Sequence, residues 1–208
     1  VMGFIDKITS TKGSYQDKRS SNDDNWEMIA TKLSGSNNLL DVACDAGFYS
    51  IKAAKLNLFV FGFDILTNSL KKARKKAKEK GVEGSVVFME MSISPENIRN
   101  LPVFDSILCL SVFHHFVRLH GENNAKAMVV DLFSKSAKSL FLQIPSKIGK
   151  YNNKLSIDFN GRKDLVDRYI RDIFVNVDSC EVVYLGKKVE KPPTEEYRFL
   201  YQINKPDN

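Results

Sequence analysis

Short apolar runs alternate with amphipathic segments along most of this chain. Five runs have the length and character of buried strands: Leu39–Ala43, Leu58–Phe63, Val86–Met91, Phe104–Leu110 and Ser139–Ile144. Helical spacing or helix-forming composition marks the segments before and between them, which are Trp26–Leu33, Tyr49–Leu56, Ser69–Lys80 and Ala125–Lys135. Apolar strands separated by helices predict a parallel sheet that is covered on both faces.

The C-terminal part of the chain follows a different pattern. A predicted helix at Lys163–Phe174 is followed by two predicted strands, Glu181–Leu185 and Tyr197–Ile203. The charged Pro-Pro segment between these strands has no room for a packed crossover helix, so an antiparallel hairpin is expected. We therefore predict a doubly wound, three-layer α/β sandwich with a seven-stranded, mostly parallel sheet that ends in an antiparallel hairpin.

One domain accounts for most of the 208 residues. Residues 1–24 are polar and are expected to form a flexible arm or lid, whereas residues 25–208 are expected to form the domain. The composition, 43% hydrophobic and 27% charged, is typical of a globular protein rather than a disordered one. No apolar run approaches the roughly 18 residues of a membrane span, and the polar start lacks a signal-peptide core, so a cytoplasmic location is predicted.

The cysteine spacing and the charge distribution indicate which metal, nucleic-acid or lipid contacts are expected. The three cysteines, Cys44, Cys109 and Cys180, are far apart and show no metal-ligand spacing, so we predict reduced thiols and no metal site. The net charge is +6, and the most basic segment is Lys71–Lys80. A solvated helix face explains this segment best, and a nucleic-acid or acidic-lipid contact is the alternative.

The chemistry concentrates where the first two predicted strands end. Residues 39–50 form an apolar strand, a small-residue turn and a helix start, which bring backbone N–H groups to the strand's carboxyl edge. Asp64 ends the second strand about 20 residues later, where a carboxylate can accept ribose hydroxyls. NAD and S-adenosylmethionine both suit this geometry. Two observations favour S-adenosylmethionine. Asp41 within the first strand suits the ammonium group of its amino-acid end, and Gly47 alone does not satisfy the G-x-G-x-x-G pattern of dinucleotide-binding folds.

This pattern resembles motif I of the class I S-adenosylmethionine-dependent methyltransferases, usually written D-x-G-x-G-x-G. The resemblance spans about residues 26–204 and implies the strand order 3-2-1-4-5-7-6. It also implies a cofactor site whose methionine, ribose, adenine and sulfonium contacts come from Asp41, Ala43, Cys44, Asp45, Gly47, Asp64, Ile65, Ser92, Ile93, Leu110 and Ser111. Ala43 and Asp45 stand where the family has glycines, and Ser92 stands where it often has an acid.

Candidate acceptor-side residues follow the fourth strand or lie in variable segments. His114 and His115 could accept a proton as the methyl group moves, and the alternative is that they pack at a helix start. The predicted substrate-binding residues are Tyr15, Arg19, Trp26, Gln143 and Tyr151. For Tyr15 and Trp26, simple packing is the alternative.

The resemblance implies in-line methyl transfer from S-adenosylmethionine to an oxygen or nitrogen of a small-molecule or glycan acceptor. An RNA acceptor stays open, because the segments around Cys109 and His120 are faintly similar to RNA γ-phosphate methyltransferases. The substituted glycine loop also leaves open a binding subunit without turnover. An NAD-dependent short-chain oxidoreductase is disfavoured, since its Tyr-x-x-x-Lys motif has one match, Tyr184 with Lys188, and that match falls on a predicted strand.

Overall fold

A computed structural model describes residues 22–145, 155–189 and 197–206. Its strands form one sheet in the order β3-β2-β1-β4-β5-β7-β6. The strand bounds are β1 Asn38–Val42, β2 Phe59–Asp64, β3 Val86–Glu90, β4 Phe104–Cys109, β5 Ser136–Pro145, β6 Glu181–Val189 and β7 Tyr197–Asn204. The first five strands are parallel, and β7 is antiparallel to both β5 and β6. The predicted fold and strand order are confirmed.

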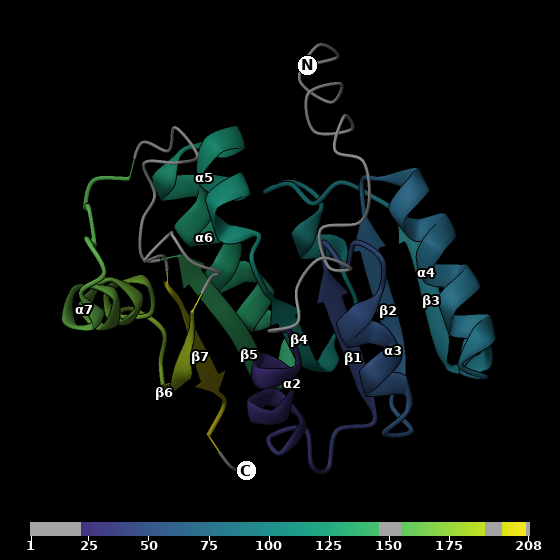
Figure 1. The fold of residues 1–208 in the computed structure, drawn as a ribbon. Coiled ribbons are helices and arrows are strands. Elements are labelled where there is room, and N and C mark those ends of the chain that lie inside the picture. Colours follow the sequence, from purple (N-terminus) through teal and green to yellow (C-terminus); the bar gives the residue numbers. More distant parts are fainter. Residues whose placement is uncertain (1–21, 146–154, 190–196, 207–208) are drawn as a thin grey trace.

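Helices cover both faces of the sheet (Figure 1). One face packs against α2 (Asn22–Ala30), α3 (Phe48–Ala54) and α4 (Thr67–Glu79). The other packs against α5 (Phe113–His120), α6 (Glu122–Ser134) and α7 (Lys163–Ile173), with the short 3-10 turn η2 (Ile98–Asn100). Successive strand residues enter opposite cores, as Leu39 and Leu40 of β1 do. This two-sided burial explains why the strands are apolar throughout.

The basic segment lies on α4, whose inner face is made of small and apolar residues. Leu70, Ala73 and Ala77 are buried, whereas the intervening basic residues are mostly exposed. Arg74 also donates a hydrogen bond from Nη2 to the carbonyl of Phe88 at 2.6 Å, which ties the helix to β3. The predicted solvated helix face is therefore present.

The element bounds agree with the predicted ones within a few residues, with two differences. The helix predicted at Ala125–Lys135 begins earlier, and a separate helix, α5, precedes it. Gly121, with φ +80°, separates α5 from α6 in a conformation that favours glycine. Strand β6 is longer than predicted because it continues past a register shift between Tyr184 and Gly186. Within the described segments, no helix is long and apolar enough to span a membrane.

Candidate functional site

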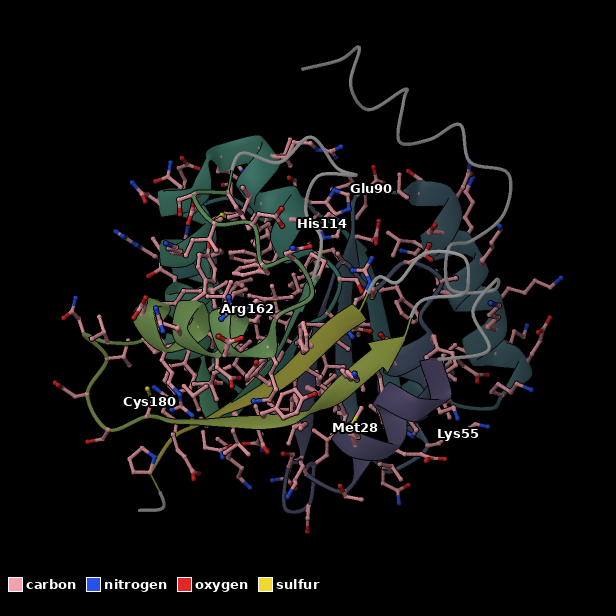
Figure 2. All side chains as sticks on the ribbon, turned by 60° about the vertical axis from the view of Figure 1, so that its left-hand side comes forward. Met28, Lys55, Glu90, His114, Arg162 and Cys180 are labelled. Atoms are coloured by element: carbon pink, nitrogen blue, oxygen red, sulfur yellow. The ribbon has the colours of Figure 1, made fainter. Side chains whose placement is uncertain are left out.

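The candidate site lies at the carboxyl ends of β1, β2 and β4. The chain winds outward from β1 through β2 to β3 and then crosses to β4, so strand order reverses between β1 and β4. Ligands of doubly wound folds bind at such a switch point. Figure 2 shows this end of the sheet near Glu90 and His114, whereas Met28, Lys55 and Cys180 lie toward the opposite end.

The loop after β1 has an unusual backbone. Ala43, Asp45 and Gly47 have φ values of 57°, 46° and 75°, so alternate residues are left-handed. These are the three positions where the resembled motif has glycines. The backbone conformation expected of glycine is thus present at Ala43 and Asp45, where a side chain makes it strained by about 1–2 kcal/mol per residue. Backbone strain of this kind is found most often at ligand-binding and active sites.

Gly47 is required by packing as well as by its φ value. A Cβ at this position would lie 2.7 Å from Cζ of Phe88 and 3.0 Å from Cβ of Ala73. Gly47 directly precedes α3, and its N–H donates to the carbonyl of Cys44 at 2.9 Å. The loop is therefore folded tightly onto α4 and β3.

Asp41 is buried in β1 with 3% of its surface exposed. Ser50 Oγ on α3 donates to its Oδ2 at 2.6 Å. Burial raises the pKa of Asp41 to about 7, and the charges of Asp64 and Asp45 add to this effect. A buried carboxylate at the end of a strand, surrounded by other acids, is a favourable position for a cationic group.

Asp64 closes β2 and holds the two neighbouring loops. Its Oδ2 accepts the N–H of Asp45 at 2.7 Å, and its Oδ1 accepts the N–H of Leu66 at 2.8 Å. Burial raises its pKa, and these hydrogen bonds oppose the shift. A carboxylate has about four lone-pair positions, so two remain for ligand hydroxyl groups. Ile65 follows with 40% of its surface exposed, an apolar side chain beside the acid.

The other predicted cofactor residues surround this edge with differing exposure. Cys44 and Ile93 are buried, and Leu110 has 7% of its surface exposed. Cys44 contributes through its backbone N–H, which donates to the carbonyl of Phe63 at 2.8 Å, whereas burial and the nearby acids raise the pKa of its thiol. The Ser92 side chain is exposed, and its carbonyl accepts from Asn97 Nδ2 at 2.6 Å.

Ser111 and Gln143 connect the ends of β4 and β5. Ser111 Oγ donates to Oε1 of Gln143 at 2.7 Å. Ser111 is also left-handed, with φ 57°, so it is strained like Ala43 and Asp45. Gln143 has 1% of its surface exposed, and its Nε2 is buried with no hydrogen-bond partner among the described residues. The structure thus brings two predicted site residues into direct contact.

His114 and His115 occupy the first turn of α5, with ring centroids 4.2 Å apart. His114 is buried, and His115 is partly exposed. Nδ1 of His115 lies 3.0 Å from Nη2 of Arg118, and since a guanidinium only donates, Nδ1 accepts. Burial lowers the pKa of His115 to about 4, and the charges of Arg118 and Arg198 contribute. His115 is therefore neutral at pH 7, with its proton on Nε2.

Arg198 is a buried cation in β7, with 2% of its surface exposed. It lies opposite Pro145 in the antiparallel pairing of β5 with β7, where Gln143 lies opposite Leu200. Gln143 and Arg198 are thus diagonal neighbours on one face of the sheet, because strand side chains alternate with period two. The charge of the Arg198 guanidinium contributes to the lowered pKa of His115, so the two side chains lie at the same end of the molecule.

The side chain of Trp26 is packed in the core and is not exposed at this edge of the sheet. It is buried with its ring 6.5 Å from that of Tyr49, and the side-chain amide of the preceding Asn25 donates to Tyr49 Oη at 3.3 Å. The packing alternative fits this position. Three other predicted substrate residues, Tyr15, Arg19 and Tyr151, lie outside the described residues. In the described part of the chain, no group of three or more His, Cys, Asp or Glu side chains could hold a metal ion.

Sequence reasoning assigned no role to Ser50, Arg118 and Arg198. Ser50 ends the motif segment and could have been identified as a hydroxyl in the first turn of the helix that follows Asp41. Arg118 lies three residues after His115, a spacing that places both on one helix face. Arg198 carried no such signal, because an arginine in an apolar strand reads as an outward-facing residue.

The comparisons with known proteins agree with this geometry. A protein-family model described as "Methyltransferase domain" matches residues 33–131. The O-antigen chain terminator bifunctional methyltransferase/kinase WbdD of Escherichia coli is 29% identical over 107 residues, which are 50% of this chain and 15% of WbdD. The chain therefore spans a small part of the curated relative that it matches.

Solved structures show the same fold. A crystal structure of WbdD superposes with a TM-score of 0.67 at 21% identity, covering 91% of this chain and 44% of that one. Magnesium protoporphyrin IX methyltransferase from Synechocystis PCC 6803, with bound S-adenosylmethionine, superposes with a TM-score of 0.68 at 19% identity, covering 98% and 91%. In its domain match, strand order and fold, the chain is therefore similar to the class I S-adenosylmethionine-dependent methyltransferases.

Proposed function

We propose that this chain transfers a methyl group from S-adenosylmethionine to an oxygen or nitrogen of a small-molecule or glycan acceptor. The observation that carries the proposal is the pair of acids at adjacent strand ends, Asp41 and Asp64, with the left-handed Ala43–Gly47 loop between them. Both acids are buried at the switch point of the sheet, where a nucleoside-bearing ligand binds.

The residues present fit this cofactor. Asp41 offers a buried carboxylate to an ammonium group, and Asp64 retains lone pairs for the two ribose hydroxyls. Exposed Ile65 offers an apolar surface to a purine ring. When bound, the cofactor supplies a methyl group on a positively charged sulfur. The chain's own residues then hold it in place, orient the acceptor and exclude water, which is most of what methyl transfer needs.

Two comparisons support the acceptor class. The curated relative is named an O-antigen chain terminator, and the Synechocystis neighbour is named a magnesium protoporphyrin IX methyltransferase. The basic surface of α4 lies on the outer face of the fold, away from the switch point, so it gives an RNA acceptor no specific support.

Calorimetric titration with S-adenosylhomocysteine tests the proposal, with NADH as the rival ligand. We expect binding of the first and none of the second, and co-purified S-adenosylhomocysteine in a native mass spectrum. Absence of both heat and thermal stabilisation at millimolar S-adenosylmethionine or S-adenosylhomocysteine would refute the proposal. Cofactor binding without methyl transfer to any acceptor that co-purifies would favour the binding-subunit alternative.

A further inference from the structure

Ser50 is a buried residue of α3 that contacts the acid of β1. It has 0% of its surface exposed, and Asp41 has 3%. Ser50 Oγ donates to Oδ2 of Asp41 at 2.6 Å, and the backbone N–H of Ser50 also donates to this carboxyl group. Ser50 lies in the first turn of α3. One residue of that turn therefore makes two hydrogen bonds to an acid of the proposed cofactor site.

The other neighbours of Asp41 disfavour its negative charge. In the strand registers Asp41 lies opposite Gly62 of β2 and Leu108 of β4, and neither side chain carries a charge. The acids that act on it are Asp64, which closes β2, and Asp45, in the loop after β1. Both repel a carboxylate, and burial, which is the larger effect, also favours the protonated form.

The thiol nearest to these acids adds no further charge. Burial and the charges of the acids, Asp41 first among them, raise the pKa of Cys44, so the thiol keeps its proton. The negative charge at this edge of the sheet therefore belongs to the carboxyl groups alone.

Ser50 supplies the hydrogen-bond donors that the charged form of Asp41 needs. A backbone N–H can only donate, and a hydroxyl donates more strongly to a carboxylate than to a protonated carboxyl group. These two hydrogen bonds lower the pKa of Asp41 against burial and the two acids, and the pKa is about 7 as a result. Without the hydroxyl, the pKa would be higher and the group would be mostly protonated at pH 7.

Packing at the start of α3 sets the position of Ser50. Gly47 directly precedes the helix, and a Cβ there would lie 2.7 Å from Cζ of Phe88 on β3. The N–H of Ile51 donates to the carbonyl of Gly47 at 2.9 Å, which closes the first turn. The hydroxyl is thus carried on a turn that packs closely against the sheet, as a positioning residue requires.

From these contacts we propose that Ser50 is a positioning residue of the cofactor site, which keeps Asp41 ionised and oriented for the ammonium group of S-adenosylmethionine. The inference rests on the proposed function, because it concerns how that site recognises the amino-acid end of the cofactor. A protonated Asp41 offers no charge to an ammonium group. Affinity should therefore fall as the pH falls through the pKa of Asp41, and Ser50 should set the pH at which this happens.

The first measurement needs no cofactor. The ¹³C resonance of the Asp41 carboxyl group reports its titration in the ligand-free full chain. Ser50→Ala removes the hydroxyl donor and keeps the N–H, so we expect the midpoint to rise by about one to two pH units, which corresponds to one charged hydrogen bond. Ser50→Cys is a second variant that keeps a side chain of similar shape with a weak donor, and its midpoint should lie between the two.

Ser136→Ala is the matched control for loss of a buried serine hydroxyl. Ser136 has 2% of its surface exposed, and its Oγ donates to the carbonyl of Phe133 at 2.8 Å, at the start of β5. This variant should lose stability and leave the Asp41 midpoint where it is. A general loss of stability would therefore not imitate the expected result.

Calorimetric titration with S-adenosylhomocysteine between pH 6 and pH 8 connects the carboxyl group to the ligand. At pH 7 we expect Ser50→Ala to bind about tenfold more weakly than the unchanged chain. The ratio of the two dissociation constants should decrease as the pH rises, because Asp41 then ionises in the variant as well. A purely structural effect of the substitution would give the same ratio at every pH.

The outcomes separate this proposal from the proposed function. If the unchanged chain binds no S-adenosylhomocysteine at any pH, the proposed function itself is removed. If it binds, and neither Ser50→Ala nor Ser50→Cys moves the Asp41 midpoint, the role of Ser50 alone is overturned. A moved midpoint with a pH-independent ratio of dissociation constants also overturns it, because the charge of Asp41 would then not act on the ligand.

Discussion

The backbone N–H of Asp45 lies 2.7 Å from Oδ2 of Asp64, so the loop that follows β1 is fastened to the acid that closes β2. The same carboxylate accepts the N–H of Leu66 at the start of α4. Asp64 therefore has two tasks in one position. It fixes the strained loop, and it retains lone pairs that can accept ligand hydroxyl groups.

Asp64→Ala should both loosen this loop and weaken cofactor binding. The amide of Asp45 loses its acceptor, so its hydrogen exchange should accelerate, and S-adenosylhomocysteine should bind at least tenfold more weakly. Asp64→Asn keeps one oxygen and should lie between the two. Exchange and calorimetry measure the two effects separately. Unchanged exchange at Asp45 would show that the loop does not depend on this hydrogen bond.

Asp41→Asn should stabilise the ligand-free protein at pH 8. The pKa of Asp41 is raised from 3.8 to about 7 by burial, so between these values the folded state binds more protons than the unfolded state. The free energy of unfolding therefore falls as the pH rises from about 4 to about 7. Asparagine keeps an oxygen for Ser50 and carries no charge, so the variant should lose this slope. Its affinity for S-adenosylmethionine should fall at the same time.

Urea unfolding at several pH values measures the slope, and Asp178→Asn is the control for loss of one exposed carboxylate. A variant that shows the same slope as the unchanged chain would mean that Asp41 is already ionised well below pH 7 in the folded protein.

Ala43→Gly should stabilise the protein by about 1 kcal/mol. Ala43 has φ 57°, which strains a residue with a Cβ by about 1–2 kcal/mol, and the extra entropy of an unfolded glycine offsets part of the gain. Ala46→Gly is the matched control, because Ala46 is buried in the same loop and is not among the positive-φ residues. It should destabilise. Thermal or urea unfolding of the two variants decides, and equal destabilisation by both would contradict the strain at Ala43.

His115 should remain uncharged down to about pH 5. Its pKa is lowered to about 4 by burial and by the charges of Arg118 and Arg198, while the unfolded imidazole binds its proton near pH 6.5. The unfolded state thus takes up the proton first on acidification, and this residue lowers stability as the pH falls from about 6.5 to about 4. Ring ¹⁵N shifts report the titration directly. A midpoint near 6.5 would show that neither burial nor the two arginines lower the pKa of the ring.

The sequence predicted the fold, and it predicted acids and a small-residue turn at one edge of the sheet, for physical reasons that are local. An acid at the end of an apolar strand, such as Asp64, and a small-residue turn such as Ala43–Gly47 are visible without tertiary structure. The surroundings of Gln143, by contrast, depend on neighbours that are distant in sequence. Arg198 meets the β5 edge only through an antiparallel register some 50 residues away, and no periodicity in one segment reports such a pairing.

The glycine substitutions illustrate the same limit. The sequence shows that Ala43 and Asp45 replace two glycines of the motif, and an alanine with negative φ would have avoided the strain. The structure instead keeps φ positive at both. The loop is held by contacts outside itself, chiefly the Asp64 carboxylate and the carbonyl of Phe63, so the surroundings and not the local residue determine the backbone.

Gly62 connects packing under this loop to the cofactor, and Gly62→Ala tests that connection. A Cβ on Gly62 would lie 2.9 Å from Sγ of Cys44 and 2.9 Å from Cδ1 of Phe88, so the variant should lose about 1–3 kcal/mol of stability. Moving Cys44 also displaces Asp45, its neighbour in the strained loop. We therefore expect weaker S-adenosylhomocysteine binding although Gly62 is not assigned any cofactor contact.

Cys44→Ala provides the second arm of a double-mutant cycle for this prediction. It removes one of the two clashing atoms, so Gly62→Ala should be less destabilising in that background. Gly84→Ala is the matched control, since a Cβ there meets nothing within 4 Å, and it should be nearly neutral. Urea unfolding measures the cycle and calorimetry measures the affinity. If the changes in the free energy of unfolding were additive, the Cβ at position 62 would not act through Cys44, and the proposed link between Gly62 and the loop would be wrong.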